Sequence, residues 1–253
     1  MKDLQVLPLI PISAGEVVHI DYQYGALAVH QTEPFPLRDI VIPLHEAYGV
    51  PLIMDMDGVV SYDPQLELLK NIAKSFPIWF DGGARFSEDI IDYFVANVET
   101  GCISTKNMDS VEEMEEAVFL SEQLSLLIDV HKGKTIAHNK KLGSMELEEL
   151  ANMAEEMEIA SVSYIDYGEL LDEELDPKVL EPLLNRNFQL FVGGLSQNRV
   201  DEWAELGLTG VFLYYRSLFQ YNNLKQGRKP EELPTTQLDE SRAPGPAPNA
   251  APS

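Results

Sequence analysis

Two glycine pairs occur in the same sequence setting. Residues 77–86 read PIWFDGGARF and residues 188–196 read FQLFVGGLS, and an amphipathic stretch and a further apolar run follow each pair. Glycines directly after a strand let the backbone approach a ligand closely, and the following helix N-terminus favours an anion. The repeat predicts a duplicated half-barrel with two phosphate-sized sites at one end. The alternative is that each pair only permits a tight turn.

Short apolar runs alternate with helical patterns along the chain, which predicts βα units and a parallel sheet. Ser110 and Ser144 are expected as helix N-caps. Two extra short strands are expected at 16–20 and 26–30. The main strands are expected near 4–10, 50–56, 77–81, 101–105, 125–130, 160–166, 188–192 and 210–214. Helices are expected at 37–48, 63–75, 87–97, 110–124, 145–157, 177–186 and 197–206.

The length of the chain suits one barrel domain. An α/β barrel has typically about 250 residues, and this chain has 253. We predict a single closed (β/α)8 TIM barrel over residues 1–225, built from half-barrels of about 1–124 and 125–225; an open doubly wound sheet is the alternative. Residues 226–253 are rich in proline, alanine and polar residues, which predicts a disordered tail.

The charge and motif content exclude several classes of function. A formal net charge of −24 argues against nucleic-acid and anionic membrane partners. No secretory signal and no membrane-spanning apolar run are present, so a cytoplasmic location is expected. Cys102, the single cysteine, is expected to be buried and inert. No P-loop, GxGxxG, CxxC or GxSxG motif occurs, so no cofactor is expected; a protein partner or a homo-oligomer stays open.

The motifs together resemble the HisA/HisF family, whose HisA member is the isomerase of phosphoribosylformimino-aminoimidazole carboxamide ribotide. This resemblance implies a barrel that binds a phosphorylated substrate at the carboxyl ends of its strands. It covers roughly residues 5–221. The segments that carry it are LPLIPISAGEVVHI at 7–20, GVPLIMDMDG at 49–58, FDGGAR at 80–85, LLIDVHKGK at 126–134, FVGGLS at 191–196 and GVFLYYRSLF at 210–219.

Departures from the family pattern argue against HisA activity. In the ungapped match anchored on Pro8 and Gly15, the catalytic aspartate of strand one falls on Pro11, and a shift of two residues puts Ser13 there, which is no carboxylate either. The opposite aspartate is kept as Asp129. Ser104 and Tyr214 replace glycines of the phosphate sites, and Asp81 replaces the first glycine of the third-strand motif. A tyrosine should crowd the second phosphate site unless its hydroxyl binds the ligand. The lysine and aspartate on strand one that HisF activity requires are also missing from this chain.

Candidate catalytic residues are the carboxylates at predicted strand ends. Asp129 is the first candidate, and Asp55 and Asp166 are further candidates. His131 is interpreted as a solvent-exposed loop residue. Asp81 would repel a phosphate unless Arg85 or Lys106 offsets its charge. The cluster of Asp55, Asp81 and Asp129 is an alternative cation site, but its spacing fixes no coordination geometry, so no metal is predicted. The predicted phosphate-binding residues are Gly82, Gly83, Arg85, Ser104, Thr105, Gly193, Gly194 and Ser196, and a chain that keeps only one of the two sites is an alternative.

Two functions compete. The first is an enzyme acting on a phosphorylated small molecule, by an isomerase- or lyase-type step in histidine-like biosynthesis or in the biosynthesis of a one-carbon carrier. The one-carbon assignment follows from resemblance to diverged HisA-like proteins encoded beside genes for pterin and methanofuran cofactors. The second is a non-catalytic binding or assembly subunit that has lost the HisA acid/base pair.

Overall fold

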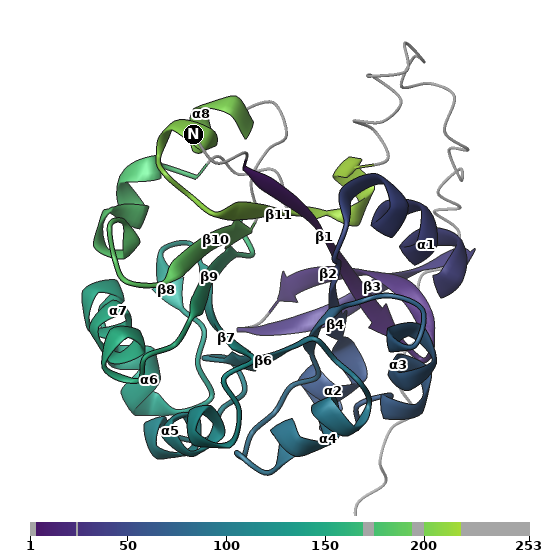
Figure 1. Cartoon of the computed structure of the whole chain (residues 1–253), viewed down its shortest axis with the longest axis horizontal. Coiled ribbons are helices and arrows are strands. Elements are labelled where there is room, and N and C mark those ends of the chain that lie inside the picture. The colour runs from purple at the N-terminus through teal and green to yellow at the C-terminus, as the bar shows by residue number, and fades with distance from the viewer. Residues whose placement is uncertain (1–3, 24, 169–174, 194–199, 219–253) are drawn as a thin grey trace, which may run out of the picture.

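Eight parallel strands form a closed ring within the described part of the chain (Figure 1). The structure is a computed structural model, and it describes residues 4–23, 25–168, 175–193 and 200–218. The ring closes because the first strand pairs in parallel with the last, with Gln5 opposite Gly210. The predicted TIM barrel is confirmed, and the open sheet is excluded. The strands are, in ring order, β1 (Gln5–Ser13), β4 (Leu52–Asp55), β5 (Trp79–Asp81), β6 (Thr100–Ser104), β7 (Leu124–His131), β9 (Ser161–Asp166), β10 (Gln189–Gly193) and β11 (Gly210–Tyr214).

Helices surround the ring on its outside (Figure 1). The segment 177–186, predicted as a regular helix, forms the shorter 3-10 helix η2 (Pro177–Leu183), in which Pro182 can donate no backbone hydrogen bond. The predicted tail at 226–253 lies outside the described residues. The α-helices are α1 (Leu37–Tyr48), α2 (Met56–Ser61), α3 (Leu66–Ala73), α4 (Asp89–Val95), α5 (Val111–Leu120), α6 (Lys140–Ser144), α7 (Leu147–Glu156) and α8 (Val200–Glu205).

Capping residues set the starts of two outer helices. The Ser110 hydroxyl accepts a hydrogen bond from the Glu113 N–H at 3.1 Å and begins α5, as predicted. The prediction for Ser144 was wrong, because this residue ends the short helix α6, which Asn139 caps. Helix α7 instead begins after Glu146, whose N–H donates to the Glu149 carboxylate at 2.8 Å.

Apolar side chains fill the interior of the barrel. Trp79 packs against Phe191 and Phe212, with ring centroids 4.9 and 5.5 Å away. Cys102 is buried in β6, as expected for an inert thiol. This aromatic packing means that the barrel is a filled core and not a pore.

The first loop of the barrel is a β-hairpin formed by β2 (Glu16–Gln23) and β3 (Ala26–Pro36). It lies across one side of the ring opening in Figure 1. Its apolar residues Val17, Val18 and Ile20 are buried. A second, very short insertion, β8 (Lys134–Thr135), pairs antiparallel with β7. The hairpin therefore covers part of the barrel end at which the parallel strands finish.

Candidate active site

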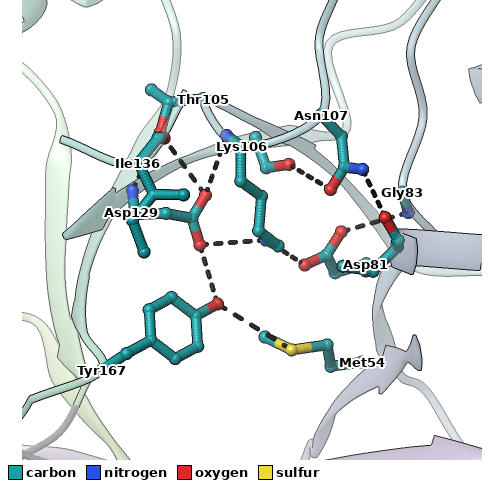
Figure 2. A network of polar contacts seen from close by, with 11 residues as sticks. Met54, Asp81, Gly83, Thr105, Lys106, Asn107, Asp129, Ile136 and Tyr167 are labelled. Atoms are coloured by element: carbon teal, nitrogen blue, oxygen red, sulfur yellow. Dashed lines mark hydrogen bonds and ion pairs between the residues drawn. The ribbon is translucent and has the colours of Figure 1, made fainter. Parts of the chain in front are cut away.

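A buried polar cluster lies at the carboxyl ends of four barrel strands (Figure 2). Asp81 is the last residue of β5, and Asp129 lies near the end of β7. Lys106 follows β6 by two residues, and Tyr167 directly follows β9. Because parallel strands finish at the same end of the barrel, residues far apart in the sequence meet here.

Lys106 bridges the two aspartates. Its Nζ atom lies 2.6 Å from Asp81 Oδ2 and 2.9 Å from Asp129 Oδ1. The Tyr167 hydroxyl donates a hydrogen bond to the same Asp129 Oδ1 atom at 2.8 Å. The lysine side chain is 4% exposed and both aspartates are fully buried. The ammonium group thus lies between the two carboxylates. Among the described residues no group of three or more acidic, histidine or cysteine side chains is arranged to hold a metal ion, so Asp55, Asp81 and Asp129 do not form the alternative cation site.

The two carboxylates control the ionisation of this cluster. Burial by itself lowers the pKa of Lys106, but attraction to Asp129 and Asp81 outweighs it and holds that pKa well above the ordinary value. Burial, reinforced by the Asp81 charge, raises the pKa of Asp129 although Lys106 opposes the rise. Burial also raises the pKa of Tyr167, so its phenol stays protonated and donates. With two acids for one ammonium, Asp129 can accept a proton more readily than an exposed carboxylate.

The second oxygen of Asp129 faces the turn after β6. The Asp129 N–H donates to the Thr105 hydroxyl at 3.0 Å, and that hydroxyl donates to the Ile136 carbonyl at 2.9 Å. Ser104 lies 3.4 Å from the Asn107 side chain. Ser104 and Thr105, both predicted to bind phosphate, are buried. Ser104 bonds within its own turn, whereas Thr105 connects that turn to β7 and to the segment after it. These bonds hold Asp129 in place for its contact with Lys106.

Asp55 lies at the start of α2 and caps that helix. One of its oxygens accepts hydrogen bonds from the backbone of Asp57 and Gly58, and the other accepts from the Gln65 N–H at 2.5 Å. Burial raises the pKa of Asp55 to about 6, although these hydrogen bonds oppose the rise. Asp166, the third predicted catalytic carboxylate, accepts a hydrogen bond from the Gly168 N–H at 2.8 Å. Asp55 and Asp166 therefore order the loops beside them.

The first glycine pair packs tightly against α2. A Cβ atom on Gly58 would lie 2.1 Å from the Gly82 carbonyl oxygen. Gly83 has a φ of +71°, and a Cβ atom there would lie 2.5 Å from the Gly58 carbonyl group. These glycines are therefore required because the backbone of α2 and the backbone of the turn after β5 approach each other closely.

Arg85, the predicted cation of this turn, is engaged with neighbouring side chains. Its Nη2 atom lies 3.5 Å from Asp109 Oδ1 and also contacts His138. The guanidinium carbon lies 4.2 Å from the centroid of the Tyr62 ring. Of the two cations considered for Asp81, Lys106 forms an ion pair with it, whereas Arg85 forms its ion pair with Asp109. The Nε atom of Arg85 is buried and has no partner among the described residues.

The second glycine pair is only partly described. Gly193 ends β10, and a Cβ atom on it would lie 2.6 Å from the Ile165 side chain. Gly194 and Ser196 lie outside the described residues. Gly82 and Gly193 do lie at the same end of the barrel, because they lie at the carboxyl ends of β5 and β10, the third and seventh strands of one parallel ring.

The first-loop hairpin is fastened at two points. The Tyr214 hydroxyl lies 2.9 Å from His19 Nδ1 and accepts a hydrogen bond from the Ile20 N–H at 3.2 Å. Tyr22 stacks on His131, with ring centroids 4.1 Å apart. Tyr214 therefore holds the hairpin, and the expectation that His131 is solvent-exposed was wrong, because the hairpin covers its ring.

Two residues of the cluster were not among the predicted catalytic residues. Lys106 was considered only as a counter-charge for Asp81, and Tyr167 was not singled out. Each follows a predicted strand by one or two residues, which is where barrel enzymes place reactive groups. That position was the available signal, but the sequence does not show which residues of a turn face the barrel axis.

The ring of eight parallel strands, with a polar cluster at their carboxyl ends, defines a (β/α)8 barrel protein. The family model of the histidine biosynthesis proteins matches residues 5–168, and the chain belongs to this family. The match extends from β1 to the end of β9 and includes Asp81, Lys106, Asp129 and Tyr167. A comparison with curated proteins found no match. No helix in the described segments has the length and apolarity needed to cross a membrane.

Proposed function

We propose that this protein is a barrel enzyme that acts on a phosphorylated small molecule by an isomerase- or lyase-type step. The observation that carries the proposal is the buried cluster of Asp81, Lys106, Asp129 and Tyr167. Removing three charges from water is costly, and buried ion pairs add little net stability compared with apolar packing. Charged groups with displaced pKa values at the carboxyl end of a barrel are therefore better explained by chemistry than by stability.

The cluster has the groups that such a step requires. Isomerase and lyase reactions of carbonyl compounds remove or add a proton beside a developing oxyanion. Asp129 is suited to carry that proton, because burial brings its pKa upward toward the working range. The Lys106 ammonium and the Tyr167 phenol are suited to stabilise negative charge on the substrate oxygen. The biosynthesis of a one-carbon carrier, or a step like those of histidine biosynthesis, supplies the context that the family suggests.

HisA activity itself is not proposed. Pro11 occupies the strand-one position of the missing aspartate, beside Met54 of β4. Proline has no side-chain proton to give or take. The protein therefore lacks the strand-one member of an acid/base pair that would act from opposite sides of the HisA substrate. Asp129 and its neighbours still support proton transfer from one side.

Phosphate binding is proposed for the two glycine turns. A hollow of about 230 Å³ lies beside the first turn; its lining includes Gly82, Gly83 and Arg85 and also the acidic residues Asp89 and Asp92. The unpaired Arg85 Nε–H is a donor suited to an anion. Gly193, Gly194 and Ser196 are proposed for the second turn on the sequence pattern alone. Sulfate soaked into crystals would reveal which turn binds an anion.

The proposal is tested by identifying a ligand and removing Asp129. Native mass spectrometry of the purified protein should reveal a co-purified phosphorylated metabolite, whose conversion is then followed by phosphorus NMR. Asp129→Asn should lower turnover roughly 10²- to 10⁴-fold, because it removes the proton carrier and keeps the shape. Unchanged turnover in Asp129→Asn would contradict the assignment.

Asp176→Asn is the matched control for this experiment. Asp176 is an exposed residue that caps η2 by accepting a hydrogen bond from the Lys178 N–H at 3.1 Å. Asparagine can accept the same bond, so turnover should stay at the level of the unmodified protein. Thermal unfolding of both variants shows whether the barrel is intact.

A non-catalytic binding or assembly subunit is the second candidate. It is favoured by one observation, namely that the Lys106 ammonium is already paired with both carboxylates inside the barrel. Pull-down of a stable protein partner, together with no calorimetric heat from a panel of sugar phosphates, would support this candidate over the enzyme.

A further inference from the structure

We propose that Lys106 forms a Schiff base with the carbonyl carbon of its substrate, which makes that substrate a phosphorylated aldehyde or ketone. This inference rests on the proposed function and names the substrate class at the same site. Lysine amines form imines with carbonyl substrates once they are deprotonated. Groups that move protons are needed to free the amine and to release water. The cluster supplies both a buried amine and such groups (Figure 2).

The position of Lys106 separates it from the other lysines. Among the lysines that the structure describes, it alone is buried. Its Nζ atom lies at the carboxyl end of the barrel between β5 and β7, because it contacts Asp81 and Asp129. To react, a carbonyl group has to reach a lysine side chain that is 4% exposed, and there it meets an acid and a phenol as well.

The reaction conserves the charge of the cluster. The ammonium and the carbonyl compound give a protonated imine and one water; the C=O bond is lost and a C=N bond forms. Two of the three ammonium protons leave with the carbonyl oxygen as water, and the third stays on the imine nitrogen. The product therefore keeps the single positive charge that Asp81 and Asp129 stabilise in the free protein.

Proton transfer within the cluster makes the amine nucleophilic. The ammonium must first give one proton to a carboxylate, and Asp129 Oδ1 is 2.9 Å away. Burial raises the pKa of Asp129, which favours this transfer, but the two carboxylates also raise the pKa of Lys106, which opposes it. The transfer is therefore uphill in the free protein and is drawn forward when the amine attacks a bound carbonyl compound. The neutral amine then attacks the carbonyl carbon. Asp129 and the Tyr167 hydroxyl, 2.8 Å apart, can pass protons to the oxygen that leaves as water.

The test is reductive trapping on the complete protein. Dihydroxyacetone phosphate is the probe, and sodium borohydride reduces any imine to a stable amine. The protein should gain the mass of the probe less one water and plus two hydrogens. Peptide mapping should find at least about tenfold more adduct on Lys106 than on an exposed lysine, because a bound probe reacts at a high effective concentration.

Two variants control the experiment. Lys106→Arg keeps the positive charge but cannot form the imine, so the adduct should disappear. Lys178→Arg, at an exposed position on η2, should leave the adduct unchanged. If Lys106→Arg fails to fold, peptide mapping of the unmodified protein still decides the question, because it reads the modified position directly.

Binding of glycerol 3-phosphate, measured by calorimetry, separates this inference from the proposed function. This compound carries the phosphate group but no carbonyl. Binding of both compounds without an adduct on Lys106 overturns the Schiff base and leaves the proposed function standing. An adduct spread evenly over surface lysines also overturns it. If neither compound binds and no adduct forms, both proposals fail.

Discussion

At the scale of single residues, the structure gives each buried carboxylate a different surrounding. Asp129 has an ammonium and a phenol as partners, whereas Asp55 has only backbone N–H donors. The balance for Asp55 is unfavourable to ionisation, since burial raises its pKa from the ordinary 3.8 to about 6. The folded protein therefore binds a proton to Asp55 at pH values where the unfolded chain has released it.

Asp55 should make the protein less stable as the pH rises. Its contribution to the free energy of unfolding is greatest below pH 3.8 and is lost as the pH rises through about 6. The loss should approach about 3 kcal/mol. Urea unfolding over this pH range should show that the free energy of unfolding of the unmodified protein falls relative to that of Asp55→Asn as the pH rises.

Asp176→Asn is the control for the pH experiment, because its carboxyl group lies at the surface. The difference in free energy of unfolding between the unmodified protein and Asp176→Asn should change much less over the same pH range. A difference between the unmodified protein and Asp55→Asn that stays constant with pH would refute the assignment of this titration to Asp55.

At the scale of elements, the contact between α2 and the turn after β5 depends on glycine. Gly58 in the helix and Gly82 and Gly83 in the turn face each other without side chains. Asp57 also ties this helix to the end of β1, since it accepts hydrogen bonds from the Ser13 hydroxyl and the Ala14 N–H. Helix α2 is thus fixed to the strand ends that carry the candidate site.

Gly58→Ala should destabilise the protein by roughly 1–3 kcal/mol or more, because a methyl group must displace backbone atoms. The clash is with the Gly82 carbonyl oxygen, 2.1 Å from the added carbon. Gly143→Ala in α6 is the matched control, since its added carbon meets only the Ala137 side chain at 3.4 Å. That variant should be neutral or slightly stabilised. Equal midpoints of chemical unfolding for the two variants would show that the predicted clash is relieved at little cost.

Sequence patterns predicted the elements better than they predicted the site. Strand positions follow from apolar runs, which depend on local sequence, and all eight were found. Asp129 was found because it ends such a run. Lys106 and Tyr167 owe their roles to partners 25 and 38 residues away, and only the folded turns bring these groups together. The 3-10 form of η2 was missed because the spacing of apolar residues over one or two turns does not separate a 3-10 helix from an α-helix.

At the scale of the whole molecule, charge is the dominant property. The net charge of −24 produces repulsion that the compact state feels more than the extended chain does. The sole positive charge within the described cluster is buried, so Lys106 does little to reduce repulsion at the surface.

Added salt should therefore stabilise the protein. Raising sodium chloride from about 0.01 M to about 0.15 M shortens the screening length from about 30 Å to about 8 Å. The thermal midpoint should rise over this range, and most of the rise should occur at the lowest concentrations. Sucrose, which is uncharged, serves as the comparison. A midpoint that falls with salt would mean that attractive surface pairs outweigh the net repulsion.

The pairing of β1 with β11 also has a consequence for synthesis of the protein. The ribosome makes β1 first and β11 last, so one edge of β1 has no partner until translation passes residue 214. An open strand edge can pair with other unfinished chains. Yield in a cell should thus depend on chaperones that shield nascent polypeptides, and codons that slow the ribosome before β11 should increase aggregation.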